Sequence, residues 1–230
     1  MKVGVIQSNY LPWRGYFDLI DDVDLFIFYD DVQFTKNDWR NRNRIKTAQG
    51  AAWLTVPVRH LTSTQLIFET EIDDSRPWRS KQLKNLVQWY GQTPYFAHYF
   101  PALSALLEAP CPNLAALNHS LCFWLMGELG IATPVQHSRN YQLDGARGDR
   151  LLSLLRQAGA SSYLSGPSAR SYLDEDAFRQ NGIQVLYKTY DYSAYPQAWG
   201  PFIGEVTVLD LLFNSGPDAR LYLKSRSPAQ

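Results

Sequence analysis

Two adjacent carboxylates, Asp30 and Asp31, directly follow the apolar and aromatic run at residues 25–29. Such a run is typical of a buried strand, so both side chains would stand where that strand ends. Carboxylates in this position can act as a general base or bind Mg²⁺. We expect Asp30 and Asp31 to be catalytic, together with the Tyr10 hydroxyl at the end of an earlier strand.

A second group of polar and aromatic side chains follows the apolar run at residues 2–7. Residues 7–16 would join this first strand to a helix, whose first turn offers free N–H groups to an anion. A glycine in this segment lets a ligand approach the backbone. The expected substrate-binding residues are Gln7, Asn9, Trp13, Gly15 and Tyr16. An ordinary loop with an aromatic plug is the alternative.

Three arginines and a lysine recur at every second position: Arg40, Arg42, Arg44 and Lys46. Residues 38–47 and 52–58 flank Gln49-Gly50, which predicts a β-hairpin with all four cations on one face. Like charges repel, and a phosphate or carboxylate ligand would remove that cost. The three arginines and Asn43 are therefore candidate substrate-binding residues. A solvated face, or one paired with nearby aspartates, is the alternative.

The last candidate segment, residues 163–173, places a strand end before a Ser-Gly turn and a short helix. Hydroxyl groups, a helix start and a guanidinium would converge there, as in many anion sites. Its candidate binding residues are Ser165, Gly166, Ser168 and Arg170. A turn held by local serine hydrogen bonds is the alternative.

A scaffold must position these segments, and the order of strand and helix patterns along the chain predicts its fold. A strand, a helix and a strand occur within residues 2–29, which indicates a right-handed βαβ unit. Helical patterns at 78–90, 96–108 and 113–129 predict a helical insertion or layer at about 78–130, after which α/β alternation resumes. We expect one α/β domain over residues 1–230, with a Rossmann-like, open, mainly parallel sheet. Ligands of such sheets bind beyond the carboxyl ends of the strands.

Composition narrows the function. The formal net charge is zero, which disfavours general nucleic-acid binding. The 7 Trp and 14 Tyr suit either a core or a sugar or nucleobase pocket. The first strand leaves no room for a signal peptide and no apolar window could span a membrane, so we expect a cytoplasmic location.

Metal and nucleophile motifs find little support. The two cysteines form no CxxC pair, and His60, His98, His119 and His137 are scattered along the chain. His119 lies in an apolar helical pattern and is expected to be a packed core residue. We expect no dedicated metal site, although a bound nucleotide could bring Mg²⁺ with it.

Several motifs together resemble the WbqC-like protein family: residues 7–17, 30–34, 39–46, 53–58, 163–166 and 209–216. The resemblance implies an association with surface-polysaccharide and O-antigen gene sets in bacteria and archaea. A more distant likeness links the chain to nucleotidylyltransferases that carry His-x-Gly-His after the first strand. Residues 13–16 (WRGY) keep the glycine and lack both histidines, which argues against nucleotidyl transfer.

Three functions follow as hypotheses. The first is a transferase or ligase that acts on a nucleotide-activated sugar or a small acyl or aminoacyl group, with a nucleotide as cofactor or substrate. The second is a non-catalytic protein that binds a glycan or a partner enzyme of the same pathway. RNA binding ranks last. The expected partner is a small molecule bearing phosphate or carboxylate, and the oligomeric state is left open.

Overall fold

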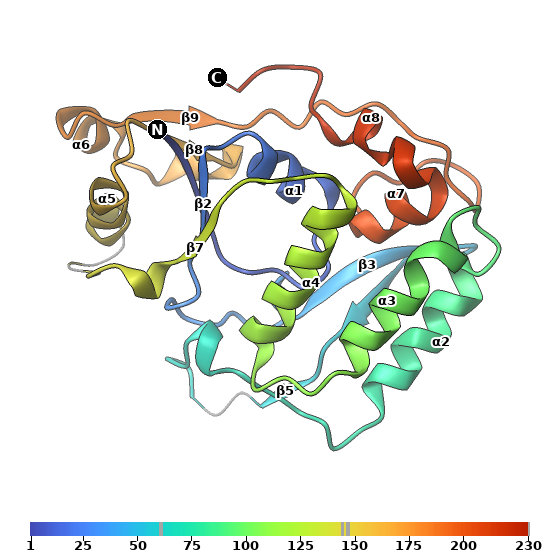
Figure 1. Ribbon diagram of the computed structural model, residues 1–230. Coiled ribbons are helices and arrows are strands. Elements are labelled where there is room, and N and C mark those ends of the chain that lie inside the picture. Colours follow the sequence, from blue (N-terminus) through green and yellow to red (C-terminus); the bar gives the residue numbers. More distant parts are fainter. Residues whose placement is uncertain (60–61, 144, 146–147, 230) are drawn as a thin grey trace.

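Five parallel strands form the central sheet, in the order β7-β2-β1-β8-β9 (Figure 1). The computed structural model describes residues 1–59, 62–143, 145 and 148–229. The strands are β1 (Lys2–Ile6), β2 (Leu25–Phe28), β7 (Val135–His137), β8 (Ser162–Ser165) and β9 (Gln184–Tyr187). The predicted Rossmann-like α/β fold is confirmed. Strand order reverses between β1 and β8, the place where such sheets bind ligands.

Each face of the sheet has its own apolar layer. Val3 and Val5 pack with helices α5 (Gly148–Gln157) and α6 (Glu175–Gln180) on one side, whereas Phe26 and Phe28 face the larger core on the other. Alternate side chains of a strand point to opposite faces, so both sides of a parallel sheet are covered. Helix α1 (Arg14–Asp21) lies on the second face, opposite α5 and α6 (Figure 1).

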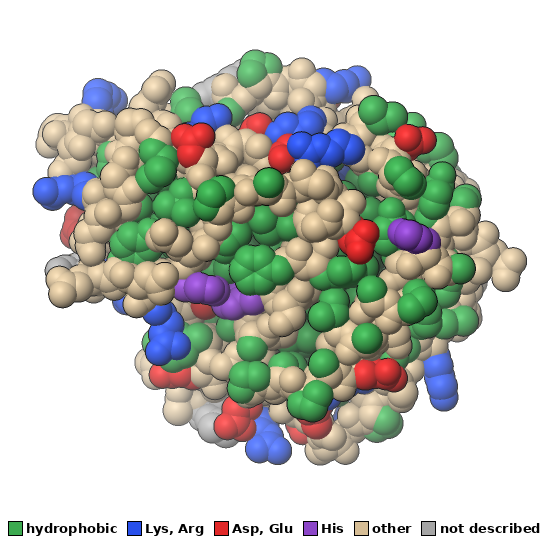
Figure 2. All heavy atoms as spheres, in the orientation of Figure 1, with side chains coloured by type: hydrophobic (Ala, Val, Ile, Leu, Met, Phe, Trp, Pro, Cys, Tyr) green, Lys and Arg blue, Asp and Glu red, His purple; other side chains and the backbone are tan. Residues whose placement is uncertain are grey.

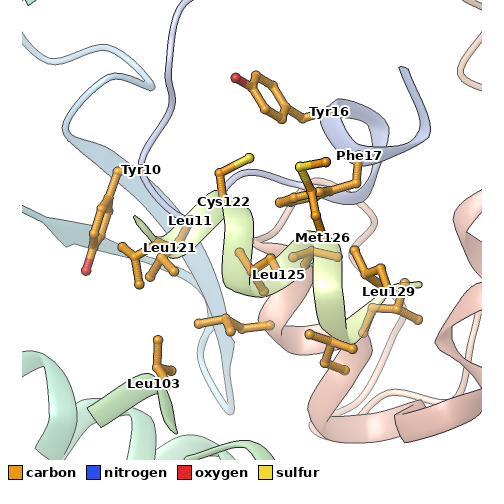
Figure 3. Close-up of a cluster of buried hydrophobic side chains, with 14 of the residues drawn as sticks. Tyr10, Leu11, Tyr16, Phe17, Leu103, Leu121, Cys122, Leu125, Met126 and Leu129 are labelled. Atoms are coloured by element: carbon orange, nitrogen blue, oxygen red, sulfur yellow. The ribbon is translucent and has the colours of Figure 1, made fainter. Parts of the chain in front are cut away.

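The predicted helical layer is present as α2 (Trp78–Tyr90), α3 (Phe96–Glu108) and α4 (Leu114–Glu128). Helix α4 packs against the segment after β1, where Leu11 and Phe17 meet Leu121 and Leu125 (Figure 3). These side chains are fully buried. The layer therefore shares the larger core with α1 and supports the loop that follows β1.

The β-hairpin is shorter than its sequence pattern suggests. Its strands are β3 (Arg42–Thr47) and β4 (Gly50–Thr55), so Arg40 lies in the turn before β3. Lys46 is only 1% exposed, and its ammonium group donates to the Gly200 carbonyl at 3.3 Å. Of the four cations predicted on one strand face, Arg42, Arg44 and Lys46 therefore alternate along β3, whereas Arg40 precedes the strand and Lys46 is buried.

The remaining elements complete the large core. A two-stranded sheet pairs β5 (Val58–Arg59) with β6 (Glu71–Ile72), and the C-terminal helices are α7 (Val208–Ser215) and α8 (Ala219–Leu223). Short 3₁₀ helices span Ile67–Glu69, Ser138–Asn140, Pro167–Ser171 and Gly216–Asp218. Across the described ranges, every helix is too short or too polar to traverse a lipid bilayer.

Candidate functional site

A pocket of about 310 Å³ opens beside the loop that follows β1. Three chain segments build it. They are the loop between β1 and α1 (residues 7–13, the β1 loop), the hairpin with the turn before it, and the segment between β9 and α7 (residues 188–207, the strap). Its lining residues are Asn9, Pro12, Trp13, Trp39, Asn43, Arg44 and Glu205. We call it the tryptophan pocket. It brings together the two predicted anion-binding segments at the N-terminal end of the chain, the β1 loop and the arginine hairpin.

Hydrogen bonds to backbone carbonyls hold the three segments in place. The Asn43 side-chain amide donates to the Tyr10 and Leu11 carbonyls, at 3.2 and 2.8 Å. Trp13 forms an isolated β-bridge with Thr207, and the Thr207 amide donates to the Arg44 carbonyl at 2.8 Å. Asn43 is 3% exposed, so this junction is fixed inside the protein. Buried amide hydrogen bonds of this kind keep a loop in one conformation.

Charged and polar groups line the pocket next to its aromatic rings. Arg44 forms an ion pair with Glu205, with 2.7 Å between Nη2 and Oε2, and its guanidinium carbon lies 5.9 Å from the Trp39 ring. The Arg40 guanidinium donates to the Asn9 side-chain oxygen. Arg44 and two indole rings thus line one hollow, and Arg40 contacts this lining through Asn9. Arg42 stacks on the Trp53 ring at 4.1 Å, outside this lining.

The Ser-Gly segment (residues 165–170) lies near the tryptophan pocket and is connected to it through Tyr190. A Cβ atom added at Gly166 would meet the Tyr190 hydroxyl at 3.3 Å, and the Tyr190 ring lies 4.9 Å from that of Trp13. Burial raises the pKa of Tyr190 to about 12. Ser165 is buried, whereas Ser168 and Arg170 are exposed, with Arg170 over the Tyr187 ring at 4.6 Å. This segment therefore supports Trp13 and does not line the pocket.

Three predicted residues of segment 7–16 have structural partners: Tyr10 in the β1 loop, and Gly15 and Tyr16 in the first turn of α1. The Tyr10 hydroxyl is fully buried and donates to Gln82 at 2.6 Å; burial raises its pKa far above the ordinary value. The catalytic role expected for Tyr10 does not fit this position. Tyr16 donates to the Gln7 carbonyl at 3.1 Å. A Cβ atom at Gly15 would lie 2.3 Å from the Trp13 ring, so Gly15 accommodates that indole.

The two adjacent aspartates face different partners. Asp30 accepts a hydrogen bond from the Ser8 amide at 2.7 Å and contacts His119 Nε2 at 2.6 Å. Asp31 accepts from the Ser138 hydroxyl and pairs with Arg150 at 2.9 Å. A shared Mg²⁺ does not fit, because separate partners already occupy both carboxylates. The residues that the structure describes contain no group of three His, Cys, Asp or Glu side chains suited to a metal ion.

Asp30 lines a second hollow of about 440 Å³, at the carboxyl ends of β2 and β7. Its lining includes Phe28, Asp30, Asn113, His119, His137 and Arg139. We call it the histidine pocket. The sequence-based interpretation of His119 as a packed core residue did not foresee that this side chain lines a pocket. The available signal was the polar pair Asn118-His119 inside an apolar helix; His60 lies outside the described residues.

Comparison with known proteins identifies a family and one similar protein. The model of the WbqC-like protein family matches residues 7–222. The chain is similar to a protein of Mycobacterium tuberculosis (strain ATCC 25618 / H37Rv) named "Uncharacterized protein Rv1507c", with 47% identity over 226 residues, 97% of each chain. No solved structure matches.

Proposed function

This chain belongs to the WbqC-like protein family, and we propose that its tryptophan pocket binds a ring-bearing anion on which it acts as a transferase or ligase. The substrate class is a nucleotide-activated sugar or a small acyl or aminoacyl group, used in surface-polysaccharide synthesis. The observation that carries the proposal is the meeting of Trp13, Trp39 and Arg44 in one hollow.

The chemistry of the lining supports this class of ligand. Indole rings offer flat apolar surfaces against which a sugar or a nucleobase can pack. A guanidinium matches the geometry of phosphate and carboxylate oxygens. The side-chain amide of Asn9 adds polar atoms for ligand hydroxyl groups, whereas the amide of Asn43 is already bonded to the β1 loop. A pocket with few polar groups among aromatic walls is the usual form of a small-molecule site.

The Arg44–Glu205 ion pair can exchange for a ligand at low cost. The Glu205 side chain is 78% exposed, and exposed ion pairs contribute about 1 kcal/mol or less. A ligand phosphate offers Arg44 two oxygens in place of one carboxylate oxygen. Arg40 is 15% exposed at its side chain and lies within reach of the same loop through Asn9. The Arg44 guanidinium can therefore leave Glu205 and bind a ligand anion in the pocket.

Calorimetric titration tests the binding step. The ligands are UDP, UDP-sugars, CDP and ATP, each at up to millimolar concentration. We expect one class to bind, and Arg44→Gln to weaken it about tenfold, the loss typical of one charge-assisted hydrogen bond. Arg59→Gln is the matched control, because Arg59, like Arg44, is a strand arginine that pairs with a glutamate: its Nη1 lies 3.4 Å from Glu71 Oε2. Absence of binding by every ligand would overturn the proposal.

A non-catalytic glycan- or partner-binding role is the second candidate. It is favoured by one observation: the lining of the tryptophan pocket does not include Asp30, the expected base. Mass spectrometry of a bound sugar nucleotide during long incubation separates the two candidates. Consumption of the sugar nucleotide supports the transferase. A sugar nucleotide that stays intact, and that binds with the same affinity after the incubation as at its start, supports the binding protein.

A further inference from the structure

We propose that the histidine pocket is a second ligand site, in which His119, oriented by Asp30, exchanges a proton with an anionic ligand held by Arg139. This inference does not depend on the proposed function of the tryptophan pocket. It assigns a chemical role to a histidine on α4 that meets the end of β2 only through the tertiary fold. The ligand class is a compound bearing phosphate or carboxylate.

The Asp30–His119 pair has the geometry of an orienting carboxylate and a proton-transfer imidazole. The Asp30 side chain is 6% exposed, and its Oδ2 lies 2.6 Å from His119 Nε2. Its other oxygen accepts the Ser8 amide, so the carboxylate cannot turn freely. A buried carboxylate fixed in this way selects the imidazole tautomer that carries hydrogen on the contacting nitrogen.

The other ring nitrogen of His119 is left for a ligand. Within the described part of the chain, no hydrogen bond reaches Nδ1. The imidazole stacks on Phe28, with ring centroids 4.2 Å apart, and lies 4.8 Å from the His137 ring. The side chain is 18% exposed and lines the pocket. With Nε2 protonated toward Asp30, Nδ1 can accept a proton from a ligand hydroxyl or amine.

One arginine and the start of a helix give the pocket positive character. Arg139 lines the pocket with its guanidinium 4.3 Å from the Phe68 ring, and no carboxylate pairs with it among the described residues. Asn113 and Ala115, at the start of α4, line the same hollow, where the helix dipole favours an anion. Figure 2 shows two histidine side chains next to each other at a hollow of this face.

His137 supplies a neutral neighbour. Burial lowers its pKa, and the adjacent His119 and Arg139 lower it further, whereas Asp30 opposes them. His137 therefore accepts or donates a hydrogen bond at neutral pH without adding a full charge. The charge that attracts the ligand then comes chiefly from Arg139 and the helix terminus, and the proton-transfer step from His119.

Nitrogen-15 spectra of the imidazole rings test the orienting pair. We expect His119 to carry its proton on Nε2 in the wild type and on Nδ1 in Asp30→Asn, because the asparagine amide would donate to Nε2. Asp31→Asn is the control and leaves the tautomer unchanged, since Asp31 contacts Ser138 and Arg150. The same tautomer in the wild type and Asp30→Asn, with both folded by circular dichroism, overturns the proposal.

Titration with inorganic phosphate, followed through the same imidazole signals, tests the anion site and needs no Asp30 variant. We expect the His119 and His137 signals to shift, and Arg139→Gln to weaken binding about tenfold. Arg156→Gln, on the exposed side of α5, is the matched control. Arg44→Gln should weaken binding in the tryptophan pocket and leave the phosphate-induced shifts of His119 and His137 unchanged, so failure of one site is distinguished from failure of the other. Unshifted signals, or equal binding by Arg139→Gln, overturn the proposal.

Discussion

The Ser8 backbone amide donates a hydrogen bond to Asp30 Oδ1 at 2.7 Å, and this contact joins the ends of β1 and β2. Asn9, the next residue, lines the tryptophan pocket, whereas Asp30 lines the histidine pocket. On the far side of this junction, Asn118 donates to the Arg40 carbonyl at 2.9 Å. These hydrogen bonds connect segments that carry residues of both pockets.

Gly15→Ala is expected to weaken ligand binding to the tryptophan pocket about tenfold and to cost about 1 to 3 kcal/mol of unfolding free energy. The added Cβ would lie 2.3 Å from the Trp13 ring and would displace it. Calorimetric titration and urea denaturation measure the two effects. Gly127→Ala in α4 is the control: its Cβ meets nothing within 4 Å, and alanine is the better helix former. Unchanged binding in Gly15→Ala would contradict the placement of Trp13.

Asp210→Ala is expected to destabilise the protein by about 3 to 5 kcal/mol. Asp210 is fully buried and accepts hydrogen bonds from Tyr90 and Tyr195, both at 2.8 Å, and from Gln197 at 2.6 Å. Its removal leaves two buried hydroxyls without an acceptor. Urea denaturation measures the loss.

The control for Asp210 is Asp176→Ala, which removes an exposed carboxylate paired with Arg179 on α6. We expect a change of about 0.5 kcal/mol or less. Similar losses in both variants would show that the Asp210 network does not stabilise the strap that carries Glu205.

Acid is expected to destabilise the contact between α1 and the C-terminal segment. Burial disfavours the charged form of Asp22, but hydrogen bonds from Lys188 and Lys224 outweigh it and lower the pKa of Asp22 below its usual value. Between the two pKa values the unfolded chain binds more protons than the folded one, so stability rises with pH there. The contribution is complete above the unfolded value and is lost as the pH falls through the folded one.

Unfolding free energies measured at about pH 6 and about pH 3 check this linkage. Asp22→Asn should show a smaller difference between the two values than the wild type, because the variant has no carboxyl group to protonate. Asp176→Asn, at an exposed position, should keep the wild-type difference. An Asp22→Asn variant with the full wild-type pH dependence would show that the contacts of Asp22 with Lys188 and Lys224 do not cause it.

Thiol labelling should distinguish the two cysteines. Burial raises the pKa of both thiols, and Cys122 is only 1% exposed, whereas Cys111 is half-buried. At neutral pH we expect Ellman's reagent to react slowly with Cys111 and with Cys122 only after unfolding, because the thiolate is the reactive form. The Cys111→Ser variant should therefore show no reaction in the native state. Rapid labelling of that variant would place Cys122 outside the core.

The sequence by itself determined the layers of this fold. The short apolar run at residues 25–29, bounded by aspartates, predicts a strand buried on both faces, and the helical spacing at 78–128 predicts a layer with an apolar side. It also placed Asn9 and Asp30 at strand ends, because parallel strands finish at one edge of a sheet. These features depend on local periodicity, which neighbouring residues specify.

The partners of these residues were decided only by the tertiary structure. His119 reaches Asp30 across 89 positions, and Glu205 reaches Arg44 across 161. An imidazole in an apolar helix has the same local pattern whether it fills the core or lines a pocket. Lys46 has the spacing of an exposed strand residue, yet the strap before α7 covers it. Which side chains meet depends on how the helices and the strap pack over the sheet, and a local pattern such as Asn118-His119 in α4 does not name the partner.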